Sequence, residues 1–175
     1  MSSHLSLLVG ACATPQNLPV ATYPPGSGQW GEVGLVVNDA QVVVQPLRVP
    51  LATKIKQQIE KAGYFSRIKV NSIYVPRQLR VQFTAKNRAS DAGKPIASAA
   101  TLFPLPMEHE IDFVASFSME CRGATVGAWE YAERVAQTQF LLIEPDSTET
   151  NVVASTVSRF IRDAAESGKL KGDCQ

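Results

Sequence analysis

Two segments of the chain alternate apolar and polar side chains, a pattern that predicts β-strands with one buried face. Between Gln78 and Lys86 the apolar positions are Leu79, Val81, Phe83 and Ala85. Between Ile111 and Arg122 they are Ile111, Phe113, Ala115, Phe117, Met119 and Cys121. Gly123 favours a hairpin turn, so a strand from Val126 to Ile143 is expected to return alongside. Its alternation breaks between Trp129 and Glu133, which predicts a bulge or a strong twist there.

The rest of the chain supplies a first strand region, two helices and a further strand. Strands are expected over Val33 to Val37 and Gln41 to Gln45, with a turn signal between them. A helix is expected from about Pro50 to Gly63, because apolar residues recur at four-residue spacing from Leu51. A strand from Arg67 to Tyr74 follows. A final helix begins near Asp146 or Thr148, carries an apolar stripe from Val153 to Ala164, and ends at Gly168.

These elements predict an α+β fold in a single domain over residues 32–175. The expected architecture is a two-layer α/β sandwich of order β–α–β–β–β–α, with a mainly antiparallel sheet and two helices on one face. The chain has 175 residues, and its apolar and charged fractions of 45% and 19% are ordinary for a globular protein. No apolar run approaches the roughly 20 residues that span a bilayer.

The amino-terminal segment Leu7-Leu8-Val9-Gly10-Ala11-Cys12 resembles the lipobox of bacterial lipoproteins. The resemblance implies a signal peptide over residues 1–11. No basic region precedes its apolar stretch, so the expectation includes a signal peptide that is truncated at its start. It also implies that Cys12 is lipidated, with palmitate among its acyl chains. Ala13 follows the cysteine in place of the aspartate that retains enteric lipoproteins in the inner membrane. The implied location is therefore the outer membrane, on its periplasmic face. The alternative is that residues 5–11 form a buried terminal strand.

A segment rich in proline, glycine and small polar residues follows Cys12. Its composition predicts a flexible tether over residues 12–31. Trp30 and Tyr23 could lie at a membrane interface. The alternative that we favour is that Trp30 caps the core beside the first strand.

Three cysteines are an odd number, which needs an explanation in an exported protein. If Cys12 carries lipid, Cys121 and Cys174 remain as a disulfide pair in an oxidising compartment. The alternative is two unpaired thiols.

The order of elements resembles a group of small bacterial envelope lipoproteins that includes the amino-terminal domain of TolB-like proteins and the lipopolysaccharide-assembly lipoprotein. The matching segments are Leu51 to Phe65, Ile111 to Ile143 and Val152 to Lys169. The chain lacks the apolar first strand of the Val-x-Pro-Phe type that is typical of TolB-like domains. The resemblance is a pattern over most of the chain after Cys12, and it implies no functional residue besides Cys12.

The sequence contains no recognisable catalytic motif, and we expect neither an enzyme nor a cofactor. A glycine-rich phosphate loop and a Gly-x-Ser-x-Gly elbow are both missing. His109, between Glu108 and Glu110, is the one histidine outside the leader, and alternation on a strand would point these neighbours to opposite faces. We therefore expect His109 to be an exposed strand residue and predict no metal site.

Charge is unevenly distributed along the chain. Residues 54–94 contain ten basic residues and two acidic ones, whereas residues 108–175 contain twelve acidic residues and six basic ones. Either oppositely charged strands lie side by side, or a basic surface formed by Arg77, Arg80, Lys86 and Arg88 binds a partner.

The sequence favours a lipid-anchored, non-enzymatic accessory or assembly subunit of an envelope complex. Its expected partners are the membrane, through Cys12, and an envelope protein, with no nucleic acid; a homo-oligomer is possible. The alternative function is a periplasmic module that binds an anionic glycan or lipid. A third possibility is a soluble protein with a structural amino terminus.

Overall fold

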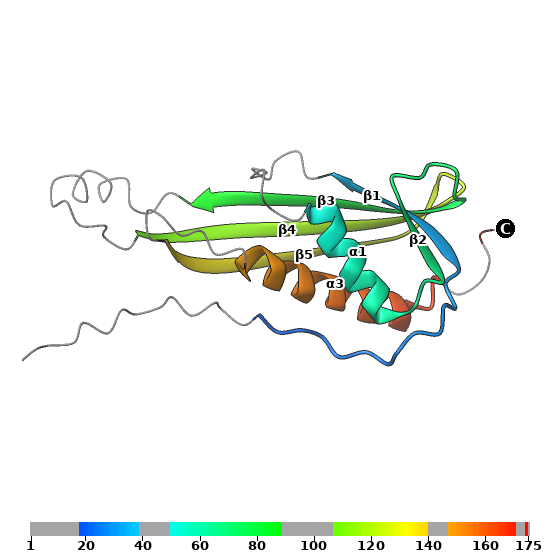
Figure 1. Ribbon diagram of the computed structural model, residues 1–175, viewed down its shortest axis with the longest axis horizontal. Helices are drawn as coiled ribbons and strands as arrows, with labels where there is room; N and C mark the ends of the chain where they lie inside the picture. The colour runs from blue at the N-terminus through cyan, green and yellow to red at the C-terminus, as the bar shows by residue number, and fades with distance from the viewer. Residues whose placement is uncertain (1–17, 39–49, 89–106, 140–146, 171–173, 175) are drawn as a thin grey trace, which may run out of the picture.

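The computed structural model describes residues 18–38, 50–88, 107–139, 147–170 and 174 (Figure 1). The elements are β1 (Glu32–Asn38), α1 (Leu51–Ala62), β2 (Arg67–Val70), β3 (Arg77–Arg88), β4 (Met107–Cys121), β5 (Ala124–Gln139) and α3 (Ser147–Ser167). The predicted α+β class is confirmed. The observed order is β–α–β–β–β–β–α, one strand more than the predicted order β–α–β–β–β–α, and the strands expected at Arg67 to Tyr74 and Gln78 to Lys86 correspond to β2 and β3. The second strand segment expected at Gln41 to Gln45 lies outside the described residues.

The five strands form one open sheet in the order β2-β1-β3-β4-β5. β1 runs parallel to both β2 and β3, whereas the long ladders β3–β4 and β4–β5 are antiparallel. The antiparallel ladders contain most of the paired residues, so the sheet is mainly antiparallel as expected. The chain passes from β2 to β3 across β1, and this crossover over residues 71–76 is much shorter than usual for parallel strands.

Both helices lie across the same face of the sheet (Figure 1). Between the layers, Phe117 of β4 stacks on Phe160 of α3 with ring centroids 4.6 Å apart. Trp129 and Tyr131 of β5 contact these two rings edge to face. The apolar positions predicted for the strands and helices thus meet in a single core.

The predicted irregularity in β5 lies elsewhere than expected. Residues 129–135 keep a regular register with β4, and the shift falls between Met119 and Glu120, opposite Thr125 to Gly127. Alternation breaks in the sequence because Glu133 occupies an inward position. Its carboxylate pairs with Arg159 of α3 and accepts a hydrogen bond from Ser155. The break in alternation therefore marks a polar contact between the sheet and α3, and it does not mark a bulge.

The second half of the predicted tether is packed against the domain. The Ala21 N–H donates to Ser158 Oγ on α3 (2.9 Å), and the N–H groups of Gly26 and Gly28 donate to the carbonyls of Ala62 and Gly63 at the end of α1. Trp30 is buried against Tyr64 and Phe65, so it caps the core and does not lie at a membrane interface. The prediction of a flexible segment is therefore wrong for residues 18–31. None of the described helices is long and apolar enough to cross a membrane.

Candidate functional site

The sheet face opposite the helices is polar but electrically balanced. Arg80 of β3 pairs with Glu120 of β4 at 2.8 Å, and Arg134 of β5 pairs with Asp112 of β4 at 2.8 Å. Lys86 lies directly opposite Asp112 in the β3–β4 register. The basic strand therefore lies beside an acidic strand, which is the simpler of the two explanations for the uneven charge along the chain.

The four predicted binding residues do not form one exposed surface. Arg77 is only 8% exposed and occupies an inward position in β3, so it lies on the opposite side of the sheet from Arg80. Arg80 is engaged by Glu120, whereas Lys86 is exposed and lies six residues further along the strand. The side chain of Arg88 lies outside the described residues. Only Arg80 contributes to the groove described next.

The crossover between β2 and β3 lies directly on the sheet, over Gly34 of β1. The Asn71 N–H donates to the Leu35 carbonyl at 2.8 Å, and Asn71 has a positive φ of 56° that turns the chain back. The Gln78 Nε2 then donates to the carbonyl oxygens of Ser72 (2.9 Å) and Val75 (2.6 Å). The crossover is therefore fixed to two neighbouring strands by hydrogen bonds.

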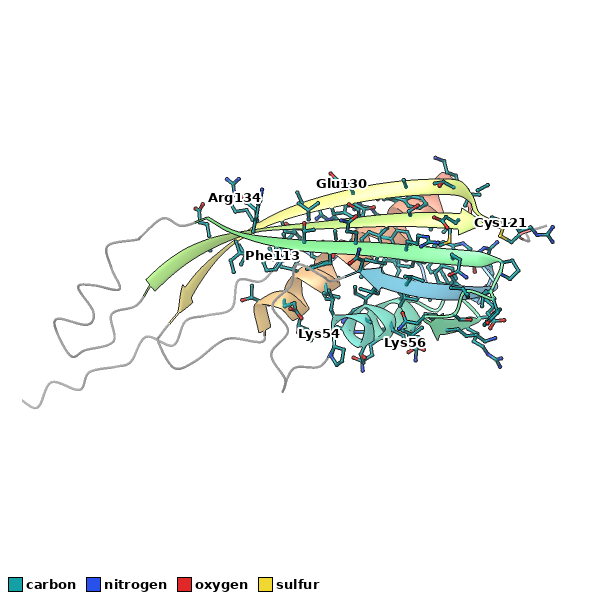
Figure 2. All side chains as sticks on the ribbon, turned by 90° about the horizontal axis from the view of Figure 1, so that it is seen from above. Lys54, Lys56, Phe113, Cys121, Glu130 and Arg134 are labelled. Carbon is teal, nitrogen blue, oxygen red and sulfur yellow. A yellow bond between two sulfur atoms is a disulfide. The ribbon has the colours of Figure 1, made fainter. Side chains whose placement is uncertain are left out.

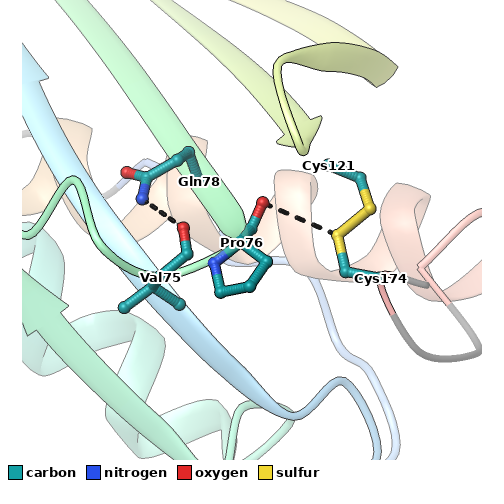
Figure 3. Close-up of a disulfide and its surroundings, with 5 residues drawn as sticks. All are labelled: Val75, Pro76, Gln78, Cys121 and Cys174. Atoms are coloured by element: carbon teal, nitrogen blue, oxygen red, sulfur yellow. Dashed lines mark hydrogen bonds between the residues drawn. A yellow bond between two sulfur atoms is a disulfide. The ribbon is translucent and has the colours of Figure 1, made fainter.

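The β4–β5 hairpin tip secures the other end of the crossover (Figure 3). The Arg122 N–H donates to the Pro76 carbonyl at 2.8 Å. Cys121 and Cys174 are joined by a disulfide, with Cα atoms 5.5 Å apart, and the Cys174 sulfur lies 3.7 Å from the same carbonyl oxygen. The cysteines expected to pair are thus side by side, and they tie the carboxyl-terminal tail to the hairpin tip and the crossover.

A groove of about 440 Å³ lies between the crossover and the hairpin tip. Its lining is mostly apolar on the crossover side and charged on the hairpin side: Val36, Ile73, Tyr74, Val75, Pro76, Gln78, Arg80, Glu120, Arg122 and Gly123. Ile73 and Tyr74 are 76% and 91% exposed, although they stand on a segment fixed at both ends. We call this region the tip groove. Large apolar side chains held rigidly in water are typical of contact surfaces.

The sequence did not indicate Ile73 and Tyr74 as surface residues. The apolar run Ile73-Tyr74-Val75 predicted the end of a strand from Arg67 to Tyr74, but β2 ends at Val70. The one available signal was Asn71-Ser72, a pair of residues common in turns.

A second polar cluster lies between β5 and α3. The Tyr131 hydroxyl donates to Asp163 Oδ2 at 2.8 Å, and the Arg159 guanidinium lies 4.9 Å from the centre of the Tyr131 ring. Burial, followed by the hydrogen bond and the charge of Asp163, raises the pKa of Tyr131 well above its usual value. These contacts join the two layers, so we interpret the cluster as structural.

Several predicted features lie outside the described residues. Cys12 and the side chain of His109 are among them. Within the part of the chain that the structure describes, no group of three or more His, Cys, Asp or Glu side chains could hold a metal ion.

No family model matches this sequence, and no curated protein matches it. Among solved structures, the minor lipoprotein of Acinetobacter baumannii is similar over 86% of this chain and 99% of that chain, at 14% identity and a TM-score of 0.40. Lipoprotein B of Nitrosomonas europaea is similar over 86% and 96%, at 9% identity and a TM-score of 0.45. The dodecameric PelC of Paraburkholderia phytofirmans is similar over 82% and 96%, at 13% identity and a TM-score of 0.43. Bacterial lipoproteins are thus among the solved structures that this chain resembles, and at this level the likeness concerns the overall fold alone.

Proposed function

We propose that this protein is a lipoprotein anchored in the outer membrane through Cys12, and that it acts as a non-enzymatic accessory subunit of an envelope complex. The observation that carries the accessory role is the tip groove, where the exposed Ile73 and Tyr74 stand on a fixed crossover. A preorganised surface binds with little loss of conformational entropy, which suits docking to another protein.

The anchor is proposed from the lipobox resemblance. The packed amino-terminal segment also limits how far the domain can lie from an anchored Cys12. Residue 18 is already held on α3 through its neighbours Pro19 and Ala21. The six residues from Cys12 to Leu18 can span at most about 20 Å. A domain anchored in this way would remain close to the membrane surface, where it could contact a membrane-embedded partner.

The alternative, a module for an anionic glycan or lipid, needs a cluster of free cations. The predicted cations do not form such a cluster, because Arg77 is buried and Arg80 is paired with Glu120. We therefore place protein docking first.

Two measurements test the proposal. Membrane fractionation and mass spectrometry of the wild type and of Cys12→Ser test the anchor. We expect an acylated Cys12 in the outer-membrane fraction, and release of Cys12→Ser into the periplasm. Retention of Cys12→Ser in the membrane, or an unmodified Cys12, would refute the anchor.

Photocrosslinking in intact cells tests the docking surface. A photoreactive residue at Tyr74 is expected to give one discrete adduct with an envelope protein, and Ile73→Ser should abolish that adduct. The same probe at Ala132, which is exposed on the same sheet face but remote from the groove, is the control. No adduct at Tyr74, or equal adducts at both positions, would refute docking through the tip groove.

A further inference from the structure

Among the described residues, the rim of the tip groove has one positive charge, on Arg122, that no ion pair compensates. Arg80 and Glu120 neutralise each other across the groove floor at 2.8 Å. Arg122 is exposed at the hairpin tip, and none of the described residues forms an ion pair with it. The groove thus combines an apolar wall with a single available guanidinium, whose planar donors match a carboxylate.

Arg122 has a positive φ, a backbone conformation that arginine rarely adopts. The hairpin loop consists of Arg122 and Gly123, with φ angles of 50° and 84°, as in a type I′ turn. Asn-Gly is the strongly preferred pair in such turns, because asparagine adopts positive φ far more readily than arginine. Strained residues of this kind are concentrated at functional sites.

The dimensions and the lining favour a short stretch of peptide as the occupant. A volume of about 440 Å³ accommodates only a few side chains of a partner. An acyl chain laid in the groove would cover the Arg80–Glu120 pair and offer it no hydrogen bond, which is unfavourable. The amide groups of a peptide can bond to these charges while its apolar side chain contacts Ile73 and Tyr74.

We propose that the tip groove binds an extended segment of a protein partner in which an aromatic or aliphatic side chain is followed by a carboxylate. Arg122 binds the carboxylate, and Val36, Ile73 and Tyr74 contact the apolar side chain. This inference rests on the proposed docking function and names the chemistry of the partner.

Arg122→Asn separates binding from folding, because it should improve the turn while removing the charge. The probes are two dye-labelled peptides, acetyl-Gly-Phe-Asp-Gly amide and the neutral match with Asn in place of Asp, titrated by fluorescence anisotropy into the full chain bearing Cys12→Ser. We expect the acidic peptide to bind roughly tenfold more tightly than the neutral one. Arg122→Asn should abolish this difference and raise the melting temperature.

Lys86→Gln is the matched control for Arg122→Asn, because it also removes one positive charge. Lys86 lies on the same sheet face as Arg80 of the groove, about 20 Å further along β3. It should leave the affinity for the acidic peptide unchanged. Equal binding of both peptides by the wild type, no measurable binding, or equal weakening by Arg122→Asn and Lys86→Gln would overturn the inference. Binding of phosphatidylglycerol vesicles in place of the peptides, with the same dependence on Arg122, would also overturn it. None of these outcomes affects crosslinking at Tyr74, so the docking function is tested separately.

Discussion

Gly34 lies directly beneath the Ser72 carbonyl, so close that a Cβ atom at position 34 would come within 2.4 Å of that oxygen. The same Cβ would lie 2.7 Å from the Gln78 side-chain amide, which holds the crossover in place. Six residues suffice to pass from β2 to β3 because the chain can lie against the bare backbone of β1. The tip groove therefore depends on the absence of a side chain at one position.

Gly34→Ala should displace the crossover and destabilise the protein by about 1–3 kcal/mol, the usual cost of overpacking. Urea unfolding of the wild type and the variant measures this change. Ala132→Val adds bulk at an exposed position on the same sheet face and should change stability by less than about 0.5 kcal/mol. Equal stability of Gly34→Ala and the wild type would show that the crossover does not need this close contact.

The strands and helices could be predicted because local periodicity reports which face is buried. β3 and β4 alternate cleanly, and the stripe on α3 recurs at helical spacing, so these assignments required no knowledge of the neighbours. The inward Glu133 was misread because its partner Arg159 lies 26 residues away, on another element. Sequence alternation cannot distinguish a paired inward charge from a bulge.

The tether and the tip groove depend on contacts distant in sequence, which composition does not report. Glycines in residues 18–31 suggested flexibility, yet a Cβ on Gly26 would lie 2.4 Å from the Tyr64 amide nitrogen. That glycine permits close packing. Likewise, Arg80 appeared to belong to a basic surface until the fold placed Glu120 beside it. The odd number of cysteines, in contrast, directly predicted a long-range contact, since the fold brings Cys121 and Cys174 together.

Removal of the Cys121–Cys174 bond should destabilise the protein through its long loop. The bond links residues 53 positions apart, for which the loss of chain entropy in the unfolded state predicts about 4 kcal/mol. Urea unfolding of the Cys121→Ser/Cys174→Ser variant, compared with the wild type with and without a reductant, measures the effect. Thiol labelling of the protein isolated from intact cells tests whether the bond forms there. Two reactive thiols in the folded protein would contradict it.

Lys54 of α1 and Glu149 of α3 form a buried ion pair at 2.9 Å, with each side chain less than 10% exposed. Lys54→Met should destabilise the protein by about 3–5 kcal/mol, because it leaves the Glu149 carboxylate without this partner in a buried position. The double variant Lys54→Met/Glu149→Leu should lose less than the sum of the two single variants.

Lys56 provides the matched control on the same helix (Figure 2). It pairs with Glu60 at 3.0 Å, but both side chains are substantially exposed. Lys56→Met should therefore cost no more than about 0.5 kcal/mol in urea unfolding. Similar losses for Lys54→Met and Lys56→Met would show that burial of the Lys54–Glu149 pair contributes little.

Tyr131 should make the stability of the protein fall at high pH. Burial and the hydrogen bond to Asp163 raise the pKa of Tyr131 in the folded state. In the unfolded chain its phenol has the usual tyrosine pKa of about 10. Above this pH the unfolded chain loses the proton that the folded chain retains, so the free energy of unfolding decreases as pH rises. Below about pH 10 both states are protonated, and the stabilisation is fully present.

Tyr131→Phe isolates this contribution, because other groups that titrate at high pH remain in both proteins. At pH 7 the variant should be less stable by about 1 kcal/mol, since it lacks the hydrogen bond to Asp163. This advantage of the wild type should shrink above about pH 10, the unfolded pKa, and vanish before about pH 11.5. Urea unfolding at a series of pH values measures it. A difference that stays constant over this range would mean that Tyr131 titrates alike in the folded and unfolded chains, and that its contact with Asp163 does not favour the protonated phenol.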